Sequence, residues 1–338
     1  MVSRIHACLK VADRSYFAII KKEVHALALS AGFSEGRTGE IDIVVAEMVT
    51  NLVKHGGGGE LLVKLVEQNG QPGIEILSVD NGPGMTDVTR MVADGVSTKN
   101  TLGQGLGAMK RLSDTFQVYS QKDWGTVILC RLFLEPVQRF VKPPPFDIRS
   151  VLIPKPGEQA CGDGFSFLPT ADGVRLFLGD GLGHGPEAEK AVRTALDAFE
   201  RCEEESPTDI IRYINGEVKK TRGLVGTAAV YKSAERKWLL CGVGNIATRF
   251  ISVTNVKSYT AYNGIIGLNV PTTMKSQEIP HEAGQQIVMC SDGLKSKWDT
   301  FRFPAIFRYD LSILATSLLK DFARHTDDMS VAICKING

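Results

Sequence analysis

Three consecutive prolines, Pro143 to Pro145, place the strongest constraint on how this 338-residue chain can fold. A run of prolines offers no backbone donors and favours extended polyproline geometry, so it continues neither a helix nor a central strand. We therefore predict a linker at residues 138–149, between an N-terminal domain at 1–137 and a C-terminal domain at 150–338. Two domains also suit the chain length, at about 100 to 200 residues per domain.

Charge and apolar runs exclude several classes of protein. The 39 basic and 38 acidic side chains leave a formal charge of +1, with no long basic run, which disfavours nucleic acid and anionic membranes as partners. The longest apolar runs are far shorter than the roughly 20 residues that span a bilayer, and early charges interrupt any signal-peptide core. The seven cysteines are odd in number and scattered, as expected for reduced thiols. We therefore expect a cytoplasmic protein.

The first half contains a helical pattern at about residues 37–54. Apolar residues recur there at helical spacing, and Glu47 and Asn51 lie one turn apart beside that stripe. A carboxylate and a carboxamide so placed suit a hard divalent cation and the acceptance of a proton. Such a pair is also common on a solvated helix face.

Two glycine-rich segments follow. Strands at 61–67 and 74–79 lead to Asp80-Asn-Gly-Pro-Gly84, which sets an acceptor-only side chain before a loop that a ligand can approach closely. Gly103-Gln-Gly-Leu-Gly107 then opens a helical stretch, where free amides favour phosphate. Each segment alone is also consistent with an ordinary turn or loop. The order and spacing of the helix and the two glycine-rich segments are more informative than any one of them.

The order of these three elements resembles the GHKL ATP-binding fold, and within it the small serine kinases of bacterial partner switching, the RsbT and RsbW group, over about residues 1–136. The stretch from Asp94 to Leu112 carries much of the likeness. The resemblance implies an α/β sandwich that binds ATP with Mg²⁺. It implies that Glu47 is the general base on a substrate serine, that Asn51 holds Mg²⁺, and that Asp80 reads adenine with help from Thr126. The remaining implied nucleotide contacts are Gly82, Gly84, Lys99, Gly103, Gly105 and Gly107, where Lys99 also fits an exposed lid lysine.

The second half predicts an α+β sandwich. Short strands alternate with glycine turns, and two amphipathic helices at about 186–205 and 208–220 interrupt them. Aspartates stand at four of the turns: Asp163, Asp180, Asp292 and the pair Asp327 and Asp328. Carboxylates gathered from four places repel unless a cation compensates, and oxygen ligands select Mg²⁺ or Mn²⁺ over zinc. A single Asp-Gly is more often only a turn.

The ordered aspartates resemble those of the metal-dependent type 2C protein phosphatases, in particular the SpoIIE and RsbX branch, over about residues 150–338. The resemblance implies an αββα sandwich with two Mn²⁺ or Mg²⁺ ions. It implies that Asp180 bridges both ions, that the Gly181 carbonyl adds a ligand, and that Asp163, Asp292 and Asp327 complete the shell, with Asp328 ranked below Asp327. His184 suits protonation of a leaving serine oxygen, although a structural role fits it as well.

Together the two resemblances imply a bifunctional serine kinase and phosphatase that acts on a STAS-domain partner in a partner-switching pathway, upstream of a sigma factor or another effector. A homodimer is implied by the kinase resemblance alone. One alternative is a phosphatase whose N-terminal domain is a nucleotide-gated binding module without kinase turnover. A third hypothesis, an ATPase without a protein substrate, lacks a transducer domain in this sequence.

Overall fold

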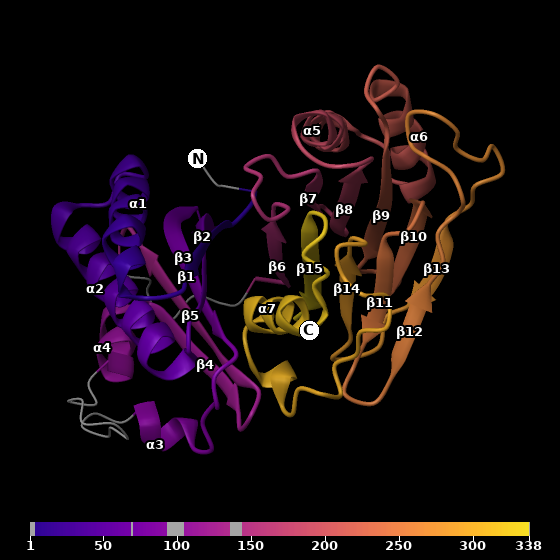
Figure 1. The fold of residues 1–338 in the computed structure, drawn as a ribbon. Coiled ribbons are helices and arrows are strands. Elements are labelled where there is room, and N and C mark those ends of the chain that lie inside the picture. The colour runs from indigo at the N-terminus through magenta and orange to yellow at the C-terminus, as the bar shows by residue number, and fades with distance from the viewer. Residues whose placement is uncertain (1–3, 69, 93–104, 136–143, 338) are drawn as a thin grey trace. The chain divides into compact units, whose positions relative to one another are not determined.

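The computed structural model describes residues 4–68, 70–92, 105–135 and 144–337. Lys99 and Gly103 lie outside this range. The chain forms two compact units: Met1–Lys142 with Phe303–Ser317, and Pro143–Arg302 with Leu318–Gly338. Figure 1 shows the helices and strands of both units, coloured by residue number.

The first unit is built on a five-stranded antiparallel sheet in the order β1-β2-β3-β5-β4. Its strands are β1 (Ala7–Val11), β2 (Gly59–Gln68), β3 (Gln71–Asp80), β4 (Thr115–Gln121) and β5 (Gly125–Phe133). Consecutive residues in the middle of β2, β3 and β5 are buried. Because neighbouring side chains of a strand point to opposite faces, the sheet buries side chains on both faces.

Helices cover one face of this sheet. They are α1 (Phe17–Ser30), α2 (Glu35–Asn51), the short α3 (Val88–Val92) and α4 (Gly105–Leu112). The predicted stripe of α2 is buried against the sheet, and the Ser34 hydroxyl caps the helix by accepting from the Arg37 N–H. A π-helical turn, Leu52–Gly56, continues α2 beyond Asn51. Such turns are frequent at functional sites.

The other face of the sheet is covered by a segment that is distant in the sequence. Residues 303–317, which include the turn η3 (Ile306–Arg308) and the start of α7 (Leu311–Phe322), are part of the first unit. On this face Glu75, Leu77, Leu129 and Arg131 alternate with the residues of the helix-side core and are buried. The sequence pattern predicts residues 303–317 wholly within the second domain, and nothing in that pattern indicates this role.

A buried ionic network ties the segment to the sheet. Glu75 and Arg131 are direct cross-strand partners, and Arg131 Nε donates to Glu75 at 2.7 Å. Arg131 also donates through Nη1 and Nη2 to the Asp310 carboxylate at 2.6 and 2.8 Å. His6 lies 3.2 Å from Glu75, and Ser312 donates to Glu75 at 3.0 Å. Burial alone would raise the pKa of Glu75, but Arg131, with His6 and Lys64, holds that pKa well below 4.5.

We expect Arg131→Ala to lower the free energy of unfolding by about 3 to 5 kcal/mol, because it leaves Glu75 and Asp310 without their buried cation. Urea denaturation followed by circular dichroism measures the loss. Since the pKa of Glu75 is depressed on folding, this stabilisation is present at neutral pH and is lost as the pH falls below about 4.5. The control is Lys21→Ala, which removes the half-exposed partner of Asp42 and should cost about 1 kcal/mol or less. Equal losses in the two variants would contradict the expectation.

The second unit contains two five-stranded sheets, in the orders β13-β10-β9-β8-β7 and β12-β11-β14-β15-β6. The first holds β7 (Asp163–Thr170), β8 (Gly173–Gly181), β9 (Leu224–Lys232), β10 (Lys237–Val243) and β13 (Gln277–Pro280). The second holds β6 (Phe146–Ile153), β11 (Ala247–Ile251), β12 (Val256–Tyr259), β14 (Gln286–Cys290) and β15 (Met329–Ile336). The aromatic pair Trp238 and Phe250 links β10 to β11, with ring centroids 6.1 Å apart.

Two amphipathic helices close the outer face of the first of these sheets. They are α5 (Pro186–Arg201) and α6 (Pro207–Glu217), each with proline in its first turn, as the sequence predicts for Pro186. Their apolar faces form one core with Phe177, Leu224 and neighbouring strand residues. Residues 146–149, which the sequence analysis placed in the linker, form the first half of β6 because Phe146 to Ile153 pair along the whole of β15.

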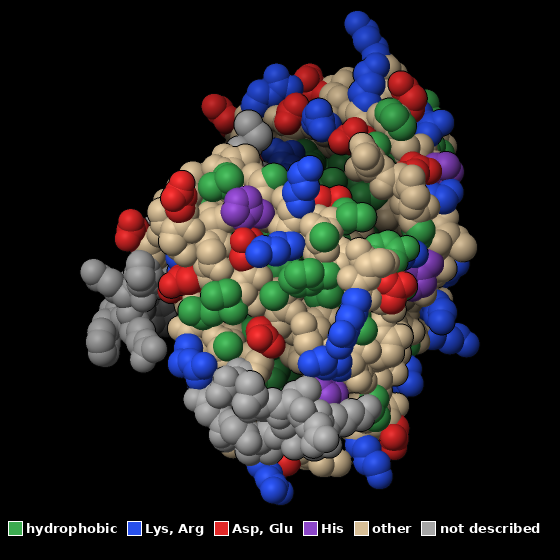
Figure 2. Space-filling model, turned by 60° about the vertical axis from the view of Figure 1, so that its left-hand side comes forward, with side chains coloured by type: hydrophobic (Ala, Val, Ile, Leu, Met, Phe, Trp, Pro, Cys, Tyr) green, Lys and Arg blue, Asp and Glu red, His purple; other side chains and the backbone are tan. Residues whose placement is uncertain are grey.

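On the face drawn in Figure 2, basic and acidic side chains are interspersed rather than gathered in one basic patch. Among the described residues, no helix is long and apolar enough to cross a membrane.

Candidate active sites

The C-terminal part of α2 carries the first candidate site. A side chain placed on Gly105, the first residue of α4, would lie 2.6 Å from Glu47 Oε2 and 3.9 Å from Asn51 Oδ1. The structure therefore brings Glu47, Asn51 and the start of α4 together, as the order of the motifs predicted. The missing side chain at Gly105 leaves the space in which the carboxylate lies.

Asp80 ends β3 and is fixed by the backbone around it. Its Oδ1 accepts N–H groups from Gly82 at 2.8 Å and from Thr126 at 3.2 Å. Thr126 is its partner across β3 and β5 and is 6% exposed, so it holds Asp80 from the adjacent strand. The carboxylate thus has a defined orientation, which a base-reading role requires.

Glycines allow the close approaches in this loop. Gly84 has φ +67°, and a Cβ there would lie 1.8 Å from the Gln121 carbonyl oxygen. A Cβ on Gly82 would lie 2.6 Å from the His55 carbonyl oxygen, in the π-helical turn that follows Asn51. The Asp80 loop and the end of α2 are therefore adjacent. Gly107 is buried within α4, and its nucleotide contact stays a prediction.

The second candidate site begins with Asp163 and Asp180, which are cross-strand partners at one end of β7 and β8. Asp163 is 3% exposed, and its Oδ2 accepts from the Ser291 hydroxyl at 2.6 Å. The other oxygen, Oδ1, is buried and makes no well-aligned hydrogen bond to a described residue, although Ser330 is close enough to lower the pKa.

The pKa values report a concentration of negative charge. Burial raises the pKa of Asp163 to about 7, opposed by Ser291 and increased by Asp328. Burial raises the pKa of Asp180 to about 10, and four further aspartates add to the rise: Asp163, Asp292, Asp327 and Asp328. A cation would relieve both effects.

The remaining aspartates differ in their contacts. Asp292 follows β14, and its Oδ2 accepts from Asn245 Nδ2 at 2.9 Å. Both oxygens of Asp328 accept backbone N–H groups, from Lys155 at 2.8 Å and from Gly162 at 2.9 Å. Asp327 makes only the local bond to the Asp328 N–H among the described contacts. Asp328 therefore organises the loops around Lys155 and Gly162.

The aspartates fit a divalent cation by chemistry, since they offer oxygen donors only and include an orphaned buried atom at Asp163. Gly181 fits as well, because its N–H donates to the Gly162 carbonyl at 2.8 Å and holds the strand end in place. Within the described parts of the chain, however, no three acidic, histidine or cysteine side chains already form a compact metal cage. The individual ligand assignments therefore stay predictions.

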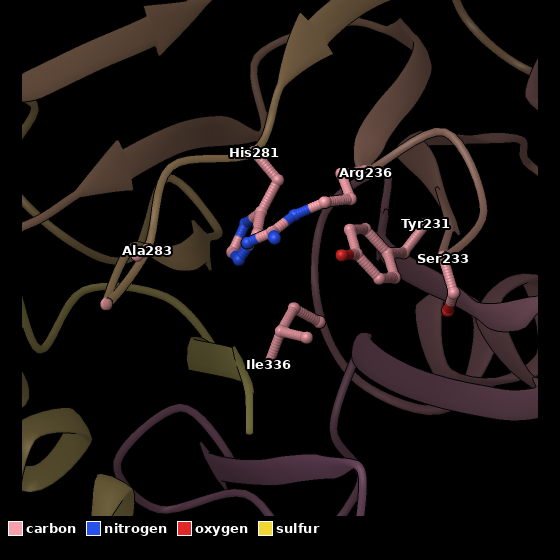
Figure 3. A pocket seen from close by; sticks show the side chains of 7 residues that line it. Tyr231, Ser233, Arg236, His281, Ala283 and Ile336 are labelled. Atoms are coloured by element: carbon pink, nitrogen blue, oxygen red, sulfur yellow. The ribbon is translucent and has the colours of Figure 1, made fainter. Parts of the chain in front are cut away.

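A separate pocket in the second unit is not this site. It has a volume of about 220 Å³ and is lined by residues including Tyr231, Arg236 and His281 (Figure 3). Tyr231 lies opposite Val174, whereas Asp180 lies opposite Val225, so the pocket and the aspartates are six residues apart along β9. At about 3.3 Å per residue, that separation is about 20 Å.

The residues that hold the aspartates are not evident from the sequence. Ser291 and Asn245 were not singled out because a lone serine or asparagine in a turn carries no distinctive pattern. The available signals are the position of Ser291 directly before Asp292 and that of Asn245 at the end of a glycine-rich segment, Gly242 to Asn245. His184 Nδ1 lies 2.5 Å from Glu158 Oε1, a pairing between distant residues that spacing could not reveal.

Comparison with known proteins finds a matching family model in each half of the chain. Residues 11–132 match the family model of the histidine kinase-like ATPase domain. Residues 170–337 match the family model of stage II sporulation protein E (SpoIIE).

Two curated relatives come from Bacillus subtilis (strain 168). The serine/threonine-protein kinase RsbT is 29% identical over 122 residues, which cover 36% of this chain and 92% of RsbT. The phosphoserine phosphatase RsbX is 28% identical over 143 residues, which cover 41% of this chain and 70% of RsbX. A solved structure described as "The bacterial stressosome: a modular system that has been adapted to control secondary messenger signaling" is 25% identical. It matches 56% of this chain and 99% of its own, with a TM-score of 0.53.

These matches confirm the two resemblances and the mixed helix and strand fold class. The chain combines a segment that matches the histidine kinase-like ATPase domain and is similar to RsbT with a segment that matches SpoIIE and is similar to RsbX.

Proposed function

We propose that this protein is a bifunctional regulator that phosphorylates and dephosphorylates a serine of a STAS-domain partner. One observation supports this most directly: a single chain holds Glu47 and Asn51 against the start of α4, and also holds a buried aspartate cluster in its second unit. The similarity to a serine kinase and to a phosphoserine phosphatase gives each cluster a matching reaction.

In the kinase reaction, ATP is the substrate and Mg²⁺ would be held by Asn51. Glu47 lies one turn before Asn51 and accepts the proton of the attacking serine hydroxyl. Asp80, oriented by Gly82 and Thr126, accepts from the adenine amino group. The Gly105 end of α4 directs free N–H groups and a favourable helix dipole at phosphate.

In the phosphatase reaction, Asp163, Asp180, Asp292 and Asp327, with the Gly181 carbonyl, would hold Mn²⁺ or Mg²⁺. The bound ions supply a water of lowered pKa and neutralise phosphoryl charge. Ser291 and Asn245 fix Asp163 and Asp292, and Asp328 fastens the loops around Lys155 and Gly162. These contacts hold the donors in place before a substrate binds.

The experiment is release of phosphate from a phosphoserine STAS-domain protein, with Mn²⁺ or Mg²⁺ and then with excess EDTA. We expect release only with the cations. A cation that binds only the folded state at a hundredfold excess over its dissociation constant adds about 2.7 kcal/mol of stability, so the second unit should also melt earlier in EDTA. Full activity and an unchanged melting temperature in EDTA would exclude the metal assignment.

A further inference from the structure

Arg222 lies across the loop that carries Asp180 and has no assigned role. Its Nη1 is 3.0 Å, and its Cζ 3.6 Å, from the position that a Cβ would take on Gly183. The side chain is exposed, and it makes no hydrogen bond or ion pair with any residue that the structure describes. An unpaired guanidinium thus rests on the segment directly after Asp180 and Gly181.

The backbone fixes this placement. β8 and β9 are neighbours, with Gly181 opposite Leu224, so the end of β8 and the start of β9 meet at one edge. The Leu182 N–H donates to the Gly223 carbonyl at 3.1 Å and fastens the residue after Arg222 to the loop. Gly183 has φ +77°, and a Cβ there would be in tight contact with the guanidinium. The loop therefore has a space that suits this arginine.

Charge balance suggests what the guanidinium binds. Four aspartates with two divalent cations are close to neutral, whereas a phosphomonoester brings about −1.5 to −2 charges that need further donors. The planar fork of arginine matches phosphate oxygens better than other side chains do. His184, on the same loop, is already paired with Glu158. Arg222 has no such partner among the described residues.

We propose that Arg222 binds the phosphoryl oxygens of the substrate, and those of the phosphate product, beside the aspartate cluster. The inference rests on the proposed phosphatase function and names the residue that recognises the phosphate group. It predicts that the phosphate affinity of the second unit depends on this side chain more than its metal affinity does.

The test is calorimetric binding of inorganic phosphate to the full chain loaded with Mn²⁺. Arg222→Ala should weaken phosphate binding about 10- to 100-fold, the usual range for a lost hydrogen-bonded charge partner. Arg222→Lys should lie between, because it keeps the charge and loses the fork. Mn²⁺ affinity should stay within about twofold of wild type in both. The matched control is Lys220→Ala, which removes a positive charge two residues away.

Four outcomes support or overturn the proposal. Unchanged phosphate affinity in Arg222→Ala overturns the proposal. An equal loss of phosphate affinity in Lys220→Ala also overturns it, because it would indicate a general effect of positive charge. If Arg222→Ala fails to fold, the Lys variant must still weaken phosphate binding, or the proposal falls. Phosphate binding that depends on Arg222 in a chain that hydrolyses no phosphoserine would uphold this inference while the proposed function fails.

Discussion

Replacing Asp180 with alanine is expected to lower phosphoserine hydrolysis by about a thousandfold or more, equal to about 4 kcal/mol of transition-state stabilisation. The reason is its position: the pKa of Asp180 responds to burial and to four other aspartates, so this carboxylate faces the greatest negative charge in the cluster. Asp180→Ala removes the carboxylate oxygens that the other four aspartates surround. Single-turnover phosphate release from a phosphoserine STAS-domain protein measures the loss.

The control for Asp180→Ala is Asp209→Ala, which removes an exposed carboxylate of the same unit that is paired with Arg212. Hydrolysis should stay within about twofold of wild type there, since an exposed pair contributes little. ATP binding should be unaffected in both variants. Near-normal hydrolysis in Asp180→Ala, with Mn²⁺ present, would remove Asp180 from the site.

Glu47→Ala should lower serine phosphorylation by about 10²- to 10⁴-fold, the range for loss of a general base. Glu47 lies against Gly105, and the α2 stripe that holds it is buried, so the substitution should leave the fold intact. Transfer of labelled phosphate from ATP to a STAS-domain protein measures the rate, and ATP affinity is measured separately. Glu47→Gln is the matched variant, because it keeps the shape and loses the basic oxygen.

The outcome for Glu47 also separates the two hypotheses for the first unit. A bifunctional chain given ATP and a shared substrate should phosphorylate and dephosphorylate that substrate in turn and so consume ATP continuously. The Glu47 variants should stop ATP consumption and leave phosphoserine hydrolysis normal. If neither wild type nor variant transfers phosphate, but ATP still changes the affinity for the partner, the unit is a nucleotide-gated binding module.

The sequence predicted the parts of both sites that depend on local pattern. The α2 stripe fixed which side of that helix is buried, and therefore where Glu47 and Asn51 lie. The Asp-Gly turns predicted that aspartates from separate turns gather around a cation, and the structure adds that Asp163 and Asp180 are cross-strand partners. Those features depend on neighbours in the sequence.

The contacts that the sequence did not predict are made between distant residues. Ser291 reaches Asp163 and Asn245 reaches Asp292 through tertiary packing, and no periodicity records such pairs. The role of residues 303–317 was also hidden, because Asp310 and Ser312 look like an ordinary helix start. Their hydrogen bonds to Arg131, Glu75 and Gln117 reveal them as part of the first unit.

The placement of residues 303–317 has a consequence for synthesis. A ribosome makes Glu75 and Arg131 early, but Asp310 emerges only after most of the second unit has been made. Until then one face of the nascent sheet lacks its cover and its buried ion pair lacks an acceptor. The histidine kinase-like unit is therefore completed late in translation, and a transcript cut at the proline run encodes a sheet without its second face.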